Sequence, residues 1–172
     1  MSIDGTQGAE PGAYIENRTY DEIALGDTAG LDRTLTKRDI ELFAVMSGDV
    51  NPAHVDPEFA ASDMFHRVIA HGMWGGALIS TVLGTELPGP GTIYLGQNLR
   101  FLGPVGLGDT VNVSVTAAEK DDKHHRITFD CKAVNQDGKT VIDGSALVIA
   151  PTEKIKRKRV TLPEVRIEGV DA

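Results

Sequence analysis

After Thr36, apolar residues recur three or four positions apart, which is the spacing of one helix face: Ile40, Phe43 and Ala44. The Thr36 side chain can cap this helix, and Asp39 completes a capping-box pattern. Ser47-Gly48 is predicted to end it. A second, short helix is predicted over Pro57–Met64, since proline is compatible with the first turn of a helix.

The segment from His71 to Leu87 is apolar on almost every side and breaks at the PGPG that follows. A helix of this kind is predicted to be enclosed by other structure rather than to lie on a surface. Gly75 and Gly76 would let another backbone approach the helix closely. The alternative is that they only weaken it, by about 1 kcal/mol each relative to alanine.

From residue 91 onward the pattern changes from helical to alternating. Residues 111–116 and 127–133 each place apolar side chains on one side of a strand and mostly polar ones on the other. Asn135-Gln136-Asp137-Gly138 is a hairpin signal, because Asp-Gly supplies the positive φ angles of a tight turn. Residues 141–150 are predicted to form the returning strand.

Together with a short strand near residues 28–35, these elements predict an α+β domain over residues 14–151. One buried helix against a curved antiparallel sheet is the arrangement of the hotdog fold, although periodicity alone does not separate it from other α+β layouts. Residues 1–13 are predicted to form a flexible arm, because few of them could bury apolar surface. Residues 152–172 contain EKIKRKR and are predicted to form a basic tail or linker.

The chain has 172 residues and a formal net charge of −8, which argues against a surface that follows nucleic-acid phosphates. No stretch approaches the roughly 20 apolar residues of a membrane span, and the first residues do not resemble a signal peptide. The single cysteine, Cys131, is expected to pack as a small hydrophobe. Without an internal disulfide or a zinc-like cluster, a cytoplasmic location is expected.

The sharpest candidate for chemistry is SGDVNPAHVDP at residues 47–57, in which Asp49 and His54 stand on a loop held by Asn51-Pro52. An aspartate and a histidine that converge can divide acid and base roles, or jointly hold a water, near neutral pH. The same letters are also ordinary turn chemistry, which local composition alone favours. A calcium loop is excluded, because Ala53 and His54 stand where it needs an oxygen ligand and a glycine.

A second candidate is Ile69-Ala70-His71-Gly72-Met73, at the start of the buried helix. Free backbone amides and the positive end of the helix dipole meet there, so Gly72 could present its N–H to a developing oxyanion. Close packing is the alternative for Gly72. For His71, the favoured interpretation is a hydrogen-bonded histidine of the core.

With both candidates in view, the sequence resembles the MaoC-like (R)-specific enoyl-CoA hydratases over residues 20–150. Three motifs carry this resemblance, namely FAVMSGDVNPAHVD at 43–56, HGM at 71–73 and YLGQNLRFLGPVGLGD at 94–109. The resemblance implies a hotdog fold that reversibly adds water to a trans-2-enoyl-CoA and yields an (R)-3-hydroxyacyl-CoA. It also implies a homodimer or larger homo-oligomer, an acyl-CoA substrate, and no metal or redox cofactor.

The motif positions imply a role for each candidate residue. Asp49 and His54 would hold the water, with His54 taking its proton during attack on Cβ and Asp49 taking part in protonating Cα. Gly72 would bind the thioester oxygen through its N–H. Asn51 would orient the water or a catalytic side chain, and Ser80 stands where this family often has a serine that faces the site.

Two positions depart from the family pattern. Position 53 is alanine where the family more often has a larger aliphatic residue, and position 74 is tryptophan where an aliphatic residue is expected. Trp74 is hypothesised to fill part of the acyl pocket and restrict it to short chains, the alternative being a purely structural core residue. The resemblance is closest to amino-terminal hydratase domains of proteins that continue into a phosphate acetyl- or butyryltransferase. Residues 154–159 would suit a linker to such an acyltransferase domain.

Other functions stay open at this point. Hotdog domains also act as thioesterases and acyl-dehydratases, and a non-catalytic module that binds acyl-CoA or assists assembly is a further alternative. The presence of both Asp49 and His54 favours a hydratase. An exposed sheet edge needs to be covered, so an edge-to-edge dimer is expected, with a CoA tunnel that two subunits could share.

Overall fold

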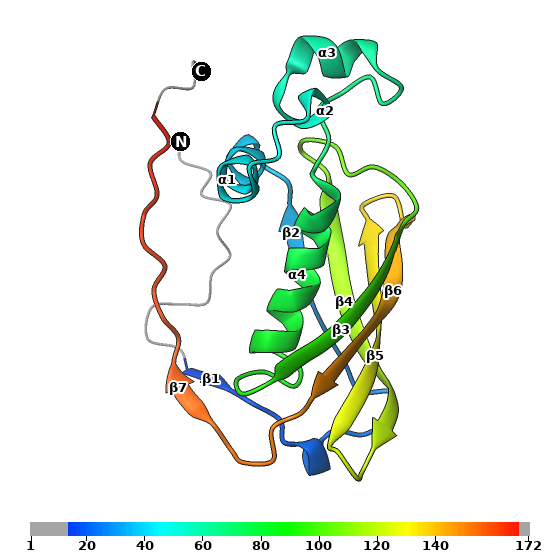
Figure 1. Ribbon diagram of the computed structural model, residues 1–172, viewed down its shortest axis with the longest axis vertical. Coiled ribbons are helices and arrows are strands. Elements are labelled where there is room, and N and C mark those ends of the chain that lie inside the picture. The colour runs from blue at the N-terminus through cyan, green and yellow to red at the C-terminus, as the bar shows by residue number, and fades with distance from the viewer. Residues whose placement is uncertain (1–13, 169–172) are drawn as a thin grey trace.

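The computed structural model describes residues 14–168, in which a five-stranded antiparallel sheet curves around one long helix (Figure 1). The strand order across the sheet is β2-β4-β5-β6-β3. The edge strands are β2 (Thr28–Thr34) and β3 (Ile93–Phe101), and the inner strands are β4 (Thr110–Asp121), β5 (Arg126–Asn135) and β6 (Thr140–Ile149). The predicted α+β hotdog arrangement is therefore confirmed.

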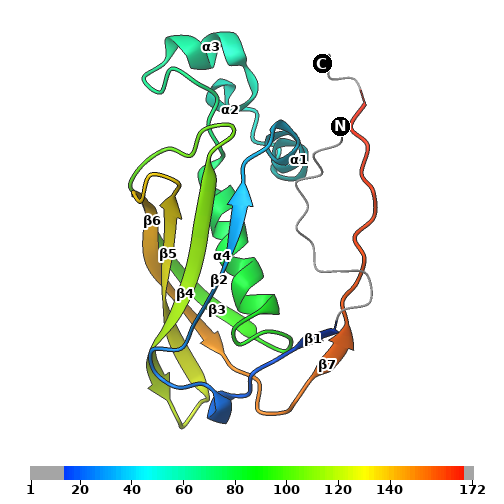
Figure 2. The ribbon, with the colours of Figure 1, turned by 180° about the vertical axis from the view of Figure 1, so that it is seen from behind.

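Helix α4 (Gly72–Thr85) lies along the concave face of the sheet, as Figure 1 and the reverse view in Figure 2 show. Its inner side is fully buried, with Ile79, Val82 and Leu83 at 0% exposure. Its outer side is exposed in the single chain, and Met73 retains 54% of its accessible surface there. The helix is therefore wrapped by the sheet, as predicted, and its outer side stays exposed in the single chain.

Gly75 and Gly76 of α4 face side chains rather than a neighbouring backbone, so the expectation that they let another backbone approach is wrong. A Cβ atom at Gly75 would overlap the Cδ1 atom of Ile142 on β6. A Cβ atom at Gly76 would lie 2.8 Å from Cε of Met73 and 3.3 Å from Cδ1 of Leu99 on β3. Gly75 therefore makes room for a side chain of the sheet, and Gly76 makes room for one of the sheet and for Met73 of its own helix.

The alternating pattern of β4 and β5 supplies the inner layer of the core. Val111, Val113 and Val115 are buried on the face that α4 covers, and the buried residues of β5 alternate in the same way. Cys131 belongs to this layer, and burial raises the pKa of its thiol to about 11. The expectation that Cys131 packs as a small hydrophobe is confirmed.

Three helices gather beside the N-terminal end of α4: α1 (Lys37–Ser47), α2 (Pro52–Val55) and α3 (Pro57–Ser62) (Figure 1). The start of α1 matches the prediction, because Thr36 and Asp39 form a capping box. Gly48 ends α1 in the left-handed conformation, with φ of 76°. Helix α2 was not predicted, because a single turn leaves too few residues for a periodic pattern.

The segment predicted as a basic tail contributes a strand. β7 (Lys156–Lys158) pairs antiparallel with β1 (Tyr14–Glu16), just before the 3-10 turn η1 (Tyr20–Glu22). The Lys156 ammonium lies 3.1 Å from the Glu16 carboxylate, which joins the basic segment to the start of the domain. The predicted arm at residues 1–13 lies outside the described residues. None of the described helices is long and apolar enough to cross a bilayer.

The loop between β3 and β4 is fixed by Asp109, which is 7% exposed. Its carboxylate accepts hydrogen bonds from the Gly106 N–H at 2.8 Å, from Gln136 at 2.9 Å and from Arg67 at 2.8 Å. Burial raises the pKa of Asp109, but these hydrogen bonds and the Arg67 charge outweigh burial and hold the pKa below its usual value. The loop thereby stays against the segment that leads into α4.

We predict that Asp109→Asn lowers the free energy of unfolding by about 2 kcal/mol at pH 7, because charge-assisted hydrogen bonds in a buried position are lost. Since the folded pKa of Asp109 is depressed, its ionised form stabilises the fold above the usual aspartate pKa. That contribution is lost as the pH falls through the folded value. Urea unfolding of the wild type and of Asp109→Asn at several pH values measures the difference in the free energy of unfolding. A difference that does not change with pH would contradict this prediction.

Candidate active site

A cavity of about 400 Å³ opens between the N-terminal end of α4, the sheet and the loop that follows β3. Most of its wall is apolar, and two histidines supply its ionisable side chains. A cavity of this size and character is typical of a site for a small organic ligand. The lining residues are His54, Phe65, Ile69, Ala70, His71, Gly72, Trp74, Gly75, Phe101, Leu102, Gly103, Pro104, Val105, Val111, Ala133 and Ile142.

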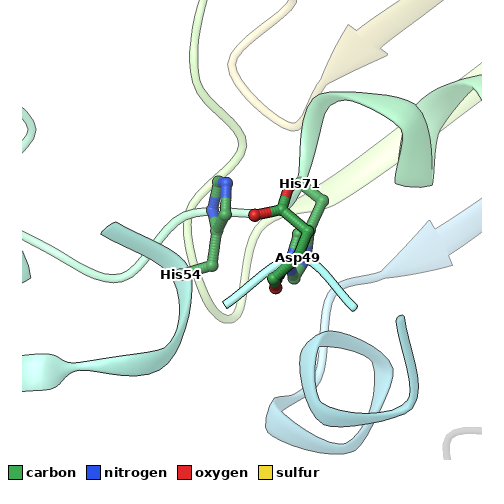
Figure 3. A group of neighbouring side chains, drawn as sticks. All are labelled: Asp49, His54 and His71. Atoms are coloured by element: carbon green, nitrogen blue, oxygen red, sulfur yellow. Dashed lines mark hydrogen bonds between the residues drawn. The ribbon is translucent and has the colours of Figure 1, made fainter. Parts of the chain in front are cut away.

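Asp49 lies on the exposed loop between α1 and α2, beside this cavity. Its Oδ1 atom accepts a hydrogen bond of 3.1 Å from the Asn51 N–H, which is an Asx turn. Figure 3 shows one carboxylate oxygen of Asp49 directed toward the His54 ring. The loop is therefore a turn, as local composition favours, and it also presents a carboxylate to His54.

His54 lies on α2 rather than on the predicted loop, and it is half-buried. Its Nδ1 atom lies 2.9 Å from the carbonyl oxygen of Ile69. A carbonyl oxygen only accepts hydrogen bonds, so Nδ1 carries the proton of the neutral ring and Nε2 keeps its lone pair. The tautomer that this contact selects leaves Nε2 able to accept a proton.

Asn51 is the N-cap of α2, and its side-chain oxygen accepts a hydrogen bond of 3.1 Å from the Ala53 N–H. This contact sets the start of the turn that carries His54. The Asn51 side chain thus helps to position His54 by fixing the backbone at the start of α2. The implied role of Asn51 in orienting a water stays a prediction.

His71 precedes α4 as its N-cap residue and is 2% exposed. The expectation of a buried histidine is confirmed, but only one of its ring nitrogens has a partner among the described residues. Nε2 lies 3.0 Å from the backbone oxygen of Asp49, whereas Nδ1 is buried without a hydrogen bond. Its ring contacts the rings of Phe43 and His54, with centroid separations of 4.8 and 4.1 Å.

Gly72 is the first residue of α4, so its N–H has no acceptor within the helix. A Cβ atom at this position would lie 3.2 Å from the ring of Phe101, so glycine lets the phenyl ring lie against the helix start, where Gly72 stays exposed. Gly72 lines the cavity, at the positive end of the helix dipole. The position is suited to binding an oxygen that gains negative charge.

Trp74 and Ser80 lie in different surroundings on α4. Trp74 is buried and lines the cavity, as the pocket hypothesis requires. Ser80 lies on the exposed side of α4 and is not among the cavity-lining residues. The single chain therefore brings His54, Gly72 and Trp74 to one cavity with Asp49 beside it, and it leaves Ser80 outside.

Asp49, His54 and His71 each offer one ligand atom, and these atoms lie within 4.8 Å of one another (Figure 3). The ligands of a tetrahedral zinc ion, each about 2.1 Å from the metal, lie only roughly 3.4 Å apart. A water that makes hydrogen bonds of about 2.8 Å keeps its partners roughly 4.6 Å apart. Atoms that all lie within 4.8 Å of one another can share one hydrogen-bonded water, and a zinc ion would need them about 3.4 Å apart.

Sequence reasoning missed two residues of the site. The backbone carbonyl of Ile69 selects the tautomer of His54, and no side-chain pattern reports such a contact. The Phe101 ring lies against Gly72, and the place of Phe101 within the motif at 94–109 is the signal that could have revealed it.

Comparison with known proteins gives consistent relatives. Residues 24–138 match the family model described as MaoC like domain. An (R)-specific enoyl-CoA hydratase of Rhodospirillum rubrum is 44% identical over 132 residues, which are 77% of this chain and 91% of the relative. A 3-hydroxybutyryl-CoA dehydratase of Methylorubrum extorquens is 40% identical over 135 residues, covering 78% of this chain and 85% of that protein.

Solved structures give the same result. The unliganded R-hydratase PhaJ1 from Pseudomonas aeruginosa superposes with a TM-score of 0.87 at 44% identity, covering 90% of this chain and 99% of that chain. The (R)-hydratase from Aeromonas caviae has a TM-score of 0.73 at 38% identity, covering 75% of this chain and 98% of that one. The family match spans most of the domain that carries Asp49, His54 and Gly72, and the chain belongs to the MaoC-like family.

Proposed function

We propose that this protein catalyses the reversible addition of water to short-chain trans-2-enoyl-CoA, giving (R)-3-hydroxyacyl-CoA. The observation that carries the proposal is the pairing of Asp49 with His54 beside an apolar cavity, where the Ile69 carbonyl leaves Nε2 of His54 free to take a proton. Relatives named as an enoyl-CoA hydratase and as a 3-hydroxybutyryl-CoA dehydratase support it, since these names describe the two directions of one reaction.

In the proposed mechanism, Asp49 and His54 hold the attacking water between them. Nε2 of His54 takes a proton from this water as its oxygen bonds to Cβ of the substrate. Negative charge then develops on the thioester oxygen, where the Gly72 N–H and the positive end of α4 stabilise it. The proton that His54 took from the water is then passed to Cα with the participation of Asp49, which completes the addition of water and leaves both side chains as they began.

The proposed reaction uses no metal or redox cofactor. Hydration of a carbon–carbon double bond transfers no electrons, and the substrate thioester already accepts the developing charge. The residues required are a base, a proton donor and an oxyanion donor, for which His54, Asp49 and Gly72 are the candidates. CoA is then the carrier of the substrate.

Incubation with crotonyl-CoA tests this function directly. Loss of the enoyl absorbance, with an (R)-3-hydroxybutyryl-CoA product, is the expected result. Release of free CoA would identify a thioesterase instead. Binding of the substrate with neither change would identify a non-catalytic acyl-CoA module.

Within the same assay, we predict that Asp49→Asn and His54→Ala each lower kcat by at least about a hundredfold, the usual scale for a lost acid or base group. The exposed residues Asp32 and His124 offer matched controls, and Asp32→Asn and His124→Ala should leave kcat unchanged. Rates close to wild type in either site variant would rule out the proposed mechanism.

Trp74 supports a preference for short acyl chains. Its indole lines the same cavity as His54 and Gly72, and it replaces the smaller aliphatic residue expected at that position. A large rigid side chain there reduces the room for an acyl chain that passes Gly72. We therefore propose that Trp74 limits the chain length.

We predict that Trp74→Leu raises the rate on eight-carbon relative to four-carbon enoyl-CoA by about tenfold, since each added methylene in a hydrophobic pocket contributes about 1 kcal/mol or more. Leucine retains apolar volume, so folding should be less affected than by alanine. Steady-state rates on the two substrates measure the ratio, with Trp74→Phe as the conservative control. An unchanged ratio would assign Trp74 to the core alone.

A homodimer is proposed from the surface that one chain leaves exposed. β3 is an edge strand, and it carries the exposed apolar side chains of Ile93, Tyr94 and Leu95. The outer side of α4 lies next to this edge (Figure 1). Pairing of two β3 strands around a two-fold axis would cover both, because a closed symmetric contact satisfies the free edge of each sheet.

We predict that Leu95→Lys shifts the protein from a dimer or larger oligomer toward the single-chain mass of 18.4 kDa, because the charge would be buried at the proposed contact. Light scattering after gel filtration measures the mass. Leu25, an exposed leucine before β2, supplies the control, and Leu25→Lys should not change the assembly. An unchanged mass for Leu95→Lys would exclude the β3 contact.

Two expectations from the sequence stay proposals. A cytoplasmic location rests on the lone cysteine, which is buried, and on the absence of disulfide chemistry among the described residues. A linkage to an acyltransferase domain rests only on the resemblance of the sequence.

A further inference from the structure

We infer that His71 is a positioning residue, which holds Asp49 in its reactive place through a hydrogen bond to the Asp49 backbone. This inference rests on the proposed hydratase function, because it assigns a task within that same site. It concerns a residue that the mechanism above does not use.

The contact that carries the inference joins Nε2 of His71 to the carbonyl oxygen of Asp49 at 3.0 Å. Because a carbonyl only accepts, Nε2 carries the proton and donates. The other hydrogen bonds of Asp49 in the described part of the chain are local, with Ser47 at 3.2 Å and Asn51 at 3.1 Å. Within that part, His71 alone ties Asp49 by hydrogen bonding to a distant element of the fold.

The ring of His71 is itself held by the surrounding structure. It stacks on the Phe43 ring of α1, with the two ring centroids 4.8 Å apart. The centroid of the His54 ring lies 4.1 Å from that of His71. As the N-cap residue of α4, it also directly precedes Gly72. The ring of His71 therefore contacts the backbone of Asp49 and the ring of His54, and His71 itself directly precedes α4 (Figure 3).

The second nitrogen of His71 argues against a purely structural role. Nδ1 is buried and has no hydrogen-bond partner among the described residues. A buried acceptor without a partner lowers stability, and an apolar side chain of similar volume would avoid that loss. What the histidine contributes, and an apolar residue would not, is the N–H that reaches Asp49.

Two amide substitutions separate the hydrogen bond from the rest of the side chain. In His71→Gln the amide nitrogen can occupy the place of Nε2, whereas the asparagine of His71→Asn is one methylene too short. We expect His71→Gln to keep kcat on crotonyl-CoA within about fivefold of wild type. We expect His71→Asn to lower kcat roughly 10- to 100-fold with little change in KM, because a small misplacement of a catalytic group slows chemistry more than binding.

Melting temperatures and a double-variant cycle complete the test. The melting temperatures of His71→Gln and His71→Asn should differ by less than about 4 °C. Val82→Ala, in the core of α4, should have a lower melting temperature and keep its kcat. In an Asp49→Asn background, adding His71→Asn should lower kcat by less than about threefold further, because no carboxylate remains to be positioned.

The outcomes distinguish this inference from the proposed function. Equal kcat values for His71→Gln and His71→Asn, or a full additional loss in the Asp49→Asn background, would overturn the role of His71. A wild-type protein that leaves crotonyl-CoA unchanged would overturn the hydratase function instead. Rescue by glutamine together with a non-additive cycle supports the inference.

Discussion

Close packing of helix α4 into the concave face of the sheet determines where every part of the candidate site lies. The helix approaches the sheet closely because Gly75 leaves room for the Ile142 side chain and Gly76 for that of Leu99. Further along α4, Ile79, Val82 and Leu83 are fully buried against the sheet, so the helix has little freedom to shift. Its first turn is fixed as a result, together with the Gly72 N–H and the indole of Trp74.

The second half of the site depends on two groups in the segment that leads into this helix, one from a backbone and one from a side chain. The backbone carbonyl of Ile69, just before α4, sets the tautomer of His54. The Nε2–H of the His71 ring donates to the backbone carbonyl of Asp49. Asp109 supports the same region, because it fastens the loop that lies against residues 68–70. A short, exposed segment thereby acquires the defined geometry that proton transfer requires.

The Asp49 loop shows that turn chemistry and catalytic chemistry do not exclude each other. One oxygen of the carboxylate closes the Asx turn onto Asn51. A carboxylate has a second oxygen and several lone pairs, so the group can still face His54. The turn itself keeps the side chain from turning away from the site.

The sequence by itself determined the local features of this protein. Thr36 and Asp39 set the start of α1, Gly48 set its end, and alternation set the faces of β4 and β5. Each of these depends on residues within a few positions of one another, which a linear pattern displays. The motif at 47–57 likewise identified Asp49 and His54, but it could not say whether they formed only a turn.

Only the tertiary structure decided which groups complete the site. The contacts of His54 with Ile69 and of His71 with Asp49 span 15 and 22 residues. Both end on backbone carbonyls, which every residue has and no sequence pattern distinguishes. The pairing of β7 with β1 and the exposed outer side of α4 were hidden for a related reason. Burial depends on which distant segments meet, and the fold settles that by packing α4 into one side of the sheet.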